Sequence, residues 1–235
     1  MEYAAFVPFK GRNWHTRLSG ILTYNQRREL ALHELFHTLS VWSRHSDLYV
    51  GLQSYGELNS SKLMMKLILL ALVYNVRLLP KFLRVHIIND PNNVNYIIQK
   101  FGLISGRGYK GIIISGSDLP LLTPEDAEYL LSLANSAERI VVFSSARDGG
   151  TPVYMIRPPG LYIPRLYVDD GYTNTERQEK NLHTLGIQYK KIVDMDGLCR
   201  DLDTPEDLSY ILTNGRNSPP VVYLRSLFPI IPLNV

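Results

Sequence analysis

The chain contains a single cysteine, Cys199, among its 235 residues. One thiol cannot form an intrachain disulfide, and it cannot build the cysteine cages that hold structural zinc. This usage is typical of a protein from a reducing compartment. We therefore expect a cytoplasmic protein without disulfides.

The sequence also lacks a strong excess of charge and a long apolar run. Its formal net charge is +3, and the basic residues are spread along the chain, which argues against a nucleic-acid arm or a polybasic membrane patch. The most apolar run, residues 63–74, contains Lys66 and is shorter than the roughly 20 residues that span a bilayer. No basic and apolar leader opens the sequence. We expect neither a nucleic-acid partner nor a membrane partner, whereas a small anionic substrate is compatible with this charge.

The composition, with 45% hydrophobic and 20% charged residues, is typical of a globular protein. Strand and helix patterns alternate along most of the chain. The pattern predicts an α/β fold with a mostly parallel sheet and helices on both faces. We expect one domain over residues 1–213 and a proline-containing tail, 214–235, that docks on the core or on a partner subunit. The predicted strands cover 4–9, 48–52, 83–88, 111–115, 139–144, 153–157 and 189–193. The predicted helices begin after Thr23, after Ser60, after Asn92 or Asn93, and at Thr123, and a later one ends near Gly186.

Three short acidic segments stand out: SDLPLLTPED at 117–126, RDGGTP at 147–152 and RDLDTPEDL at 200–208. In the first and third, an aspartate precedes Thr-Pro-Glu-Asp, where threonine caps a helix, proline opens it and the acids complement its positive end. Asp118 and Asp203 are therefore expected in the loops between strands and helices. These loops lie at the edge of the sheet where open α/β folds bind ligands. A helix-capping role for the two aspartates is the structural alternative.

The ordered set of motifs resembles the 2-phospho-L-lactate guanylyltransferases of deazaflavin coenzyme biosynthesis, relatives of the molybdenum-cofactor guanylyltransferases. It comprises residues 7–32, NNVNYII at 92–98, and the three acidic segments. The resemblance covers about residues 4–212, with 53–82 and the tail unmatched. It implies a Rossmann-like nucleotidyltransferase fold, with a nucleotide half at about 1–146 and an acceptor half at about 147–213. It also implies transfer of GMP from GTP to a phosphorylated three-carbon acid, such as 2-phospho-L-lactate or phosphoenolpyruvate, with release of pyrophosphate.

This reaction brings two polyanions together, so the site must supply positive charge. Lys10, Arg12 and Arg17 follow the first strand, in the position of the family's triphosphate loop, and arginine forks suit phosphate oxygens. Magnesium prefers oxygen ligands and uses one or two carboxylates with substrate phosphates, so Asp118, Asp201 and Asp203 are the candidate ligands. We expect Lys10, Arg17 and Asp118 to act in catalysis. A general base is not needed because the attacking phosphate is already ionised.

Recognition of the base and of the acid depends on fewer residues. By resemblance, Asn95 lies near the nucleotide. Thr151 and the glycines of the DGGT segment, Gly149 among them, suit the acceptor, with Asp148 orienting that loop. The resemblance adds Gly171 and Asn174, which align with a Gly-x-x-Ser element of the family. The chain departs from the family at Pro152, Asn174 and Gln178, where asparagine, serine and histidine are usual. The type of transfer is therefore better supported than the identity of the acid, and a homodimer is a further expectation.

Residues 33–37 read HELFH, the HExxH pattern of zinc peptidases. The apolar stripe of this predicted helix is Leu32, Leu35, Phe36 and Leu39, which turns the two histidines to a flank and Glu34 to the solvated side. We therefore interpret the pattern as coincidental. The remaining alternatives are a sugar-phosphate or molybdopterin nucleotidyltransferase, and a nucleotide-binding homologue without turnover.

Overall fold

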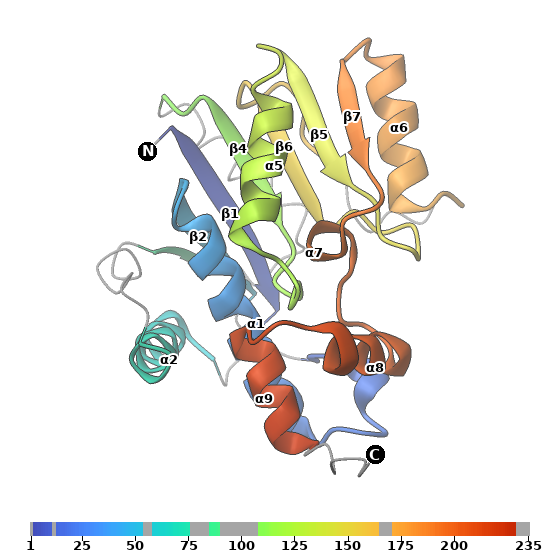
Figure 1. The fold of residues 1–235 in the computed structure, drawn as a ribbon. Coiled ribbons are helices and arrows are strands. Elements are labelled where there is room, and N and C mark those ends of the chain that lie inside the picture. The colour runs from blue at the N-terminus through green and yellow to red at the C-terminus, as the bar shows by residue number, and fades with distance from the viewer. Residues whose placement is uncertain are drawn as a thin grey trace.

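A computed structural model describes residues 2–10, 13–53, 58–75, 85–89, 108–164 and 171–228. Within these ranges, seven strands form one sheet in the order β3-β2-β1-β4-β6-β5-β7 (Figure 1). The strands are β1 Tyr3–Lys10, β2 Ser46–Gln53, β3 His86–Asn89, β4 Gly111–Ser115, β5 Ile140–Ser144, β6 Val153–Arg157 and β7 Tyr189–Ile192. The helices are α1 Tyr24–Trp42, α2 Ser60–Val73, α5 Pro124–Ala134, α6 Asn174–Thr184, α7 Asp196–Cys199, α8 Pro205–Asn214, α9 Pro219–Leu227 and the 3₁₀ turn η1 Thr16–Leu18.

The sheet is mostly parallel, as predicted. Only β6 runs against its neighbours β4 and β5 among the strand pairs of the described ranges. Because β6 is antiparallel, it begins at the edge where the parallel strands end. Strand β1 has β2 on one side and β4 on the other, so the chain order reverses beside it. Such a reversal is where open α/β sheets place a ligand site.

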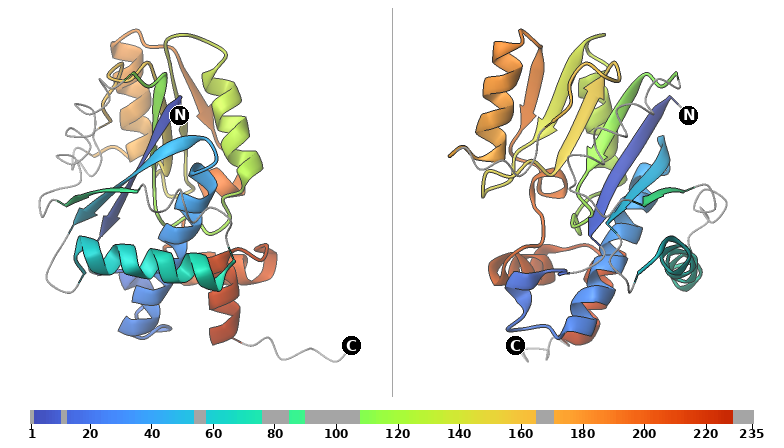
Figure 2. Two further views of the ribbon diagram at one scale, coloured as in Figure 1. Left: turned by 90° about the vertical axis from the view of Figure 1, so that its left-hand side faces the viewer. Right: turned by 180° about the vertical axis from the view of Figure 1, so that it is seen from behind.

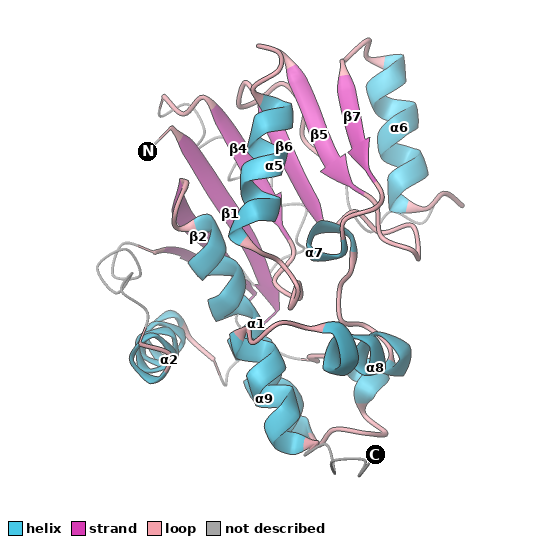
Figure 3. Cartoon of the chain, viewed as in Figure 1, coloured by secondary structure: helices cyan, strands magenta, loops and turns pink. Residues whose placement is uncertain are grey.

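Helices lie on both faces of the sheet, as the alternation predicted (Figures 2 and 3). Along β1, Tyr3, Ala5, Val7 and Phe9 join the core formed with α1, α2 and α5. The intervening Ala4 and Phe6 join the opposite core, to which α6 contributes Leu182. This alternation is the two-residue period of a strand buried on both sides.

Capping boxes begin four of the described helices. Thr23 with Gln26 begins α1, and Thr123 with Asp126 begins α5; Thr173 with Glu176 and Thr204 with Asp207 do the same for α6 and α8. Pro124 and Pro205 open α5 and α8, as the two Thr-Pro-Glu-Asp segments predicted. The caps are threonines, so neither Asp118 nor Asp203 is the capping residue.

The tail docks on the same chain through α9, which packs on α1 and α8. Val221 and Leu224 enter a small core with Leu22, Leu30 and Ile211. The Tyr223 ring stacks on His33 with 4.6 Å between centroids. Of the two placements expected for the tail, residues 214–228 therefore take the one on the core of this chain, while residues 229–235 lie outside the described ranges.

Helix α2 corresponds to the apolar helix predicted after Ser60. Its Leu63, Leu67 and Ala71 are buried, whereas Met65 and Val73 are exposed. In the described part of the chain, no helix is both long enough and apolar enough to cross a membrane. The strand predicted at 83–88 is described from residue 85 onward and corresponds to β3, which begins at His86. The helix predicted after Asn92 or Asn93 lies outside the described residues.

Candidate active site

A cavity of about 570 Å³ opens at the edge of the sheet where β1 and β4 end. Its wall combines the loop after β1, the loop after β4, the loop between β5 and β6, the start of α6 and the segment before α8. Eight residues predicted for the site line it together: Lys10, Arg17, Asp118, Asp148, Thr151, Asn174, Asp201 and Asp203. The sheet topology explains much of this gathering, because the loops after β1, β4 and β5 leave the sheet at the same edge.

Four predicted site residues are not placed in the wall. Arg12 and Asn95 lie outside the described residues. Gly149 has φ +82°, and a β-carbon there would lie 2.6 Å from Cβ of Thr173, so this glycine permits close packing of its loop on the start of α6. Gly171, with φ +79°, lies in the turn before α6 and has open space beside it.

The acidic side chains of the cavity repel one another. Burial, followed by the charges of Asp118, Asp203 and Asp148, raises the pKa of Asp201 to about 8. Burial and Asp118 likewise raise the pKa of Asp203, while Arg17 acts in the opposite direction. A carboxylate cluster with so little neutralising charge suits a bound cation.

The predicted phosphate loop, which follows β1 and carries Arg17, contacts this acidic cluster. Nη1 of Arg17 lies 3.3 Å from Oδ2 of Asp203, and both side chains are partly exposed. The indole Nε1 of Trp14 donates to the Lys10 carbonyl oxygen at 2.6 Å, which folds the loop back on the end of β1. The exposed Arg17–Asp203 pair contributes little to stability, so the Arg17 guanidinium can exchange this carboxylate for a phosphate.

The DGGT loop is held by short-range hydrogen bonds. Oδ1 of Asp148 accepts from the Gly150 N–H at 2.8 Å, which supports its predicted role of orienting the loop. The Thr175 N–H donates to the Gly149 carbonyl at 2.9 Å and the Thr175 hydroxyl to the Gly150 carbonyl at 3.0 Å. The loop and the start of α6 therefore form one unit on the acceptor side of the cavity.

Asn174, the first residue of α6, has a defined amide orientation. Nη1 of Arg177 donates to Oδ1 of Asn174 at 2.8 Å. Because a guanidinium only donates, the oxygen of the amide must face Arg177, and its NH₂ group remains available for an acceptor. Of the departures from the family, Asn174 and Pro152 line the cavity, whereas Gln178 is buried and accepts from the Tyr162 hydroxyl.

The HExxH residues do not converge on a metal. Nδ1 of His33 lies 2.8 Å from the Glu29 carbonyl, and Nε2 of His37 lies 2.8 Å from the Leu122 carbonyl. Glu34 contacts His15 instead, with 2.7 Å between Oε2 and Nε2. The zinc-peptidase alternative is therefore wrong.

The predicted solvated position of Glu34 is also wrong, since this side chain is 1% exposed, and His37, predicted on the flank, is only 8% exposed. Helix α1 contacts the sheet, α2, α5 and α9, so it is covered on more sides than a single apolar stripe indicates. Periodicity assumes one covered face.

His15 and Glu34 are cavity residues that the sequence did not reveal. Burial alone would lower the pKa of His15, but the Glu34 carboxylate, Asp118 and the Leu202 carbonyl together raise it to about 9. The imidazole therefore bears a positive charge beside the acidic cluster. The two residues are distant from the acidic motifs in sequence. The left-handed backbone at His15, with φ 44°, has no recognisable sequence signal.

The donor set of the cavity fits a hard divalent cation better than a zinc cage. Among the residues described, no three His, Cys, Asp or Glu side chains form a ready-made metal cluster. Magnesium does not require one, because it binds through one or two carboxylates and completes its shell with water and substrate phosphates. The carboxylates of Asp118, Asp201 and Asp203, which line the same cavity, meet that requirement.

Solved structures with the same fold include proteins described as a nucleotide-diphospho-sugar transferase and as a cytidylyltransferase. A nucleotide-diphospho-sugar transferase from Desulfovibrio desulfuricans superposes with a TM-score of 0.73 at 16% identity, covering 97% of this chain and 96% of the other. A cytidylyltransferase from Leptospira borgpetersenii gives a TM-score of 0.52 at 13% identity, covering 97% and 95%. At these identities the similarity shows the fold alone, and it confirms the predicted nucleotidyltransferase fold.

Sequence relatives include the 2-phospho-L-lactate guanylyltransferase of Methanosarcina barkeri, 24% identical over 214 residues, which are 90% of this chain and 86% of the relative. The same enzyme of Archaeoglobus fulgidus is 23% identical over 94% of this chain and 88% of its own. The phosphoenolpyruvate guanylyltransferase of Thermobaculum terrenum is 28% identical over 102 residues, which are 43% of this chain and 42% of the relative.

A family model described as "Guanylyl transferase CofC like" matches residues 61–232, which is more than half of the chain. The match includes 61–82 and most of the tail, so the expectation that these segments fall outside the family resemblance is wrong. The docking of α9 against the core agrees with its place inside the match. The chain belongs to the family of CofC-like guanylyl transferases.

Proposed function

We propose that the chain is a guanylyltransferase that transfers GMP from GTP to a phosphorylated three-carbon acid, either 2-phospho-L-lactate or phosphoenolpyruvate, and releases pyrophosphate. The observation that carries the proposal is the single cavity shared by Asp118, Asp201 and Asp203, which come from distant parts of the sequence, and by Lys10 and Arg17. Relatives with this activity, at 24% and 28% identity, supply the two acceptors.

Mg²⁺ is the proposed cofactor, held by Asp118 with one or both of Asp201 and Asp203. When bound, it would neutralise charge on the triphosphate and on the leaving pyrophosphate. The raised pKa of Asp201 supports this assignment, because a cation would relieve the repulsion from Asp118 and Asp203 that contributes to it.

The cationic side chains bind the nucleotide in this proposal. Lys10 ends β1 and Arg17 lies in η1, both lining the cavity that holds the acidic cluster, and Arg12 is proposed to act with them. Arg17 can pair bidentately with phosphate oxygens. In the transfer, an oxygen of the acceptor phosphate forms a bond to the α-phosphorus of GTP while the bond to the bridging oxygen of the β-phosphate breaks. Pyrophosphate takes the bonding electrons, and no proton has to move.

The acceptor is proposed to lie between Thr151 and Asn174, with the loop of Asp148 and Gly149 and the turn at Gly171 shaping that wall. The Asn174 amide, with its oxygen held by Arg177, presents N–H groups to a carboxylate or phosphate. Asn95 remains the proposed contact to guanine, and a homodimer remains a prediction.

A pyrophosphate-release assay tests the proposal. GTP, ATP, CTP and UTP are each combined with 2-phospholactate, phosphoenolpyruvate and 3-phosphoglycerate in the presence of Mg²⁺. We expect release with GTP and one of the first two acids. GTP binding without release from any acid would indicate a nucleotide-binding protein that lacks turnover. Release with a sugar phosphate in place of the acids would identify a different nucleotidyltransferase.

A further inference from the structure

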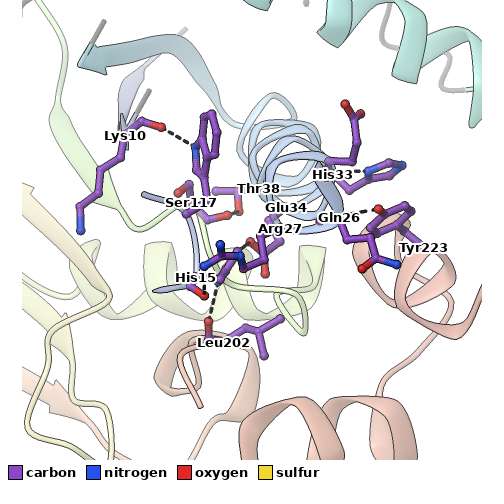
Figure 4. A network of polar contacts seen from close by, with 12 residues as sticks. Lys10, His15, Gln26, Arg27, His33, Glu34, Thr38, Ser117, Leu202 and Tyr223 are labelled. Atoms are coloured by element: carbon purple, nitrogen blue, oxygen red, sulfur yellow. Dashed lines mark hydrogen bonds and ion pairs between the residues drawn. The ribbon is translucent and has the colours of Figure 1, made fainter. Parts of the chain in front are cut away.

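The His15 side chain lies where three cavity segments meet (Figure 4). Its Nδ1 is 3.0 Å from the Leu202 carbonyl oxygen, and its Nε2 is 2.7 Å from Oε2 of Glu34 on α1. Leu202 stands between Asp201 and Asp203. His15 itself stands two residues before Arg17 in the predicted phosphate loop.

These contacts continue through the backbone into the third segment. The Leu202 N–H donates to the Asp118 carbonyl oxygen at 3.1 Å. One continuous path of hydrogen bonds therefore runs from Glu34 through His15 and Leu202 to Asp118. Of the candidate metal-binding aspartates, Asp118 is part of this path, and Asp201 and Asp203 are the sequence neighbours of Leu202.

The direction of the bonds follows from the chemistry of the groups. A carbonyl oxygen only accepts, so Nδ1 of His15 must carry a hydrogen and donate it to Leu202. The charged imidazole then donates its Nε2 hydrogen to the Glu34 carboxylate. Glu34 therefore holds the ring in place.

The His15–Glu34 pair joins these segments at a cost in free energy of folding. His15 adopts a left-handed backbone, with φ 44° and ψ 50°, which is unfavourable for a residue with a β-carbon. The side chains of His15 and Glu34 are 5% and 1% exposed, and Oε1 of Glu34 has no hydrogen-bond partner among the described residues. A buried charged pair with an unsatisfied oxygen is a poor source of stability. A positional role accounts better for its presence.

We propose that His15, held by Glu34, is a positioning residue that fixes the acidic loop at 201–203 relative to the phosphate loop and Asp118. The inference rests on the proposed function, in which those segments carry the cation and the triphosphate. Without the His15 contact, the aspartates and Arg17 would no longer share one fixed geometry. Misplacement of about 1 Å can reduce the rate roughly 100-fold while binding changes less.

Kinetics of paired variants test this role. We expect His15→Ala and Glu34→Ala to lower kcat roughly 10- to 100-fold, with KM for GTP changed by less than about threefold. The double variant should lose no more than the more damaging single variant, because the two residues act as one unit. Glu34→Gln, whose amide can still bond to Nε2, should recover most of the loss. Ser40→Ala, which removes only a hydroxyl bonded to the Phe36 carbonyl of α1, is the matched control.

Hydrogen exchange of the ligand-free protein provides a readout that does not depend on turnover. The Leu202 amide, bonded to Asp118, should exchange faster in His15→Ala than in the wild type or in Ser40→Ala, while amides in β4 and β5 keep their protection. Unchanged exchange at Leu202 would overturn the inference, as would a kcat of His15→Ala within twofold of an active wild type. A wild type that releases no pyrophosphate would contradict the proposed function, and the exchange result would then decide the inference alone.

Discussion

Asp201 is a half-buried carboxylate whose charged neighbours are mostly other carboxylates. Burial and the charges of Asp118, Asp203 and Asp148 raise its pKa in the folded protein to about 8, well above the usual value for an unfolded chain. A raised folded-state pKa gives stability that is present at low pH and is lost as pH rises toward 8. The side chain therefore costs stability at neutral pH, as expected of a residue retained for binding.

Replacement of Asp201 by asparagine should stabilise the metal-free protein. We expect a higher Tm for Asp201→Asn at pH 8, corresponding to more than about 1 kcal/mol, the equivalent of a single pKa unit, and a smaller gain at pH 5. Thermal unfolding with EDTA measures the effect, and Asp194→Asn, at an exposed aspartate nearby, is the control. Added Mg²⁺ should reduce the difference in Tm between Asp201→Asn and the wild type, because the cation would relieve the repulsion among the carboxylates. A lower Tm for Asp201→Asn at pH 8 would contradict the electrostatic description of the cluster.

The titration of His37 makes stability depend on pH in the opposite direction from that of Asp201. Burial lowers its pKa to about 4, although its bond to the Leu122 carbonyl acts in the other direction. Below about pH 6.5 the unfolded chain therefore binds a proton that the folded chain does not, and stability falls as the pH falls toward 4.

A wild-type loss of about 2 kcal/mol from this residue is expected between pH 7 and pH 5. His37→Gln, which can keep the bond to Leu122 without titrating, should remove that part of the loss. Urea unfolding at the two pH values gives the comparison. Equal pH dependence of the variant and the wild type would show that His37 does not titrate as described.

At the level of elements, threonine caps connect helix stability to the site. Thr204 caps α8 directly after Asp203, which lines the cavity, whereas Thr23 caps α1 in the same kind of box and is not adjacent in sequence to a cavity residue. Loss of either cap should cost about 1 kcal/mol. Thr204 should in addition hold the acidic segment in its turn.

We expect Thr204→Ala and Thr23→Ala to lower the free energy of unfolding by similar amounts, and only Thr204→Ala to lower kcat. Urea unfolding and pyrophosphate release, measured on the same preparations, separate the two effects. A kcat reduced equally in both variants would mean that stability, rather than the position of Asp203, determines the activity.

Most of these elements could be predicted because their signals are local. Apolar runs marked β4 and β5, and the boxes at Thr23 and Thr123 marked the starts of α1 and α5. The direction of β6 and the partners of α1 depend on contacts distant in sequence. The short helix α7 and the course of α9 carried no clear pattern, and α9 begins with two prolines that resemble a loop.

At the scale of the whole molecule, the topology made part of the site predictable. The acidic segments could be assigned to one edge because parallel strands end together, and Asp118 and Asp203 do share a cavity there. The His15–Glu34 pair could not be predicted in this way. It depends on a left-handed residue and on a helix covered from several sides, which periodicity does not describe. The division into nucleotide and acceptor halves remains a prediction.

The most direct measurement is pyrophosphate release from GTP and the preferred acid, compared between the wild type and Asp118→Asn with Mg²⁺ present. The proposal predicts that Asp118→Asn folds, as judged by its circular dichroism and Tm, and still binds GTP. It also predicts a loss of at least about 100-fold in kcat, because the carboxylate that would hold the charge-neutralising cation is missing. A folded Asp118→Asn that releases pyrophosphate at the wild-type rate would contradict the proposed metal-dependent transfer.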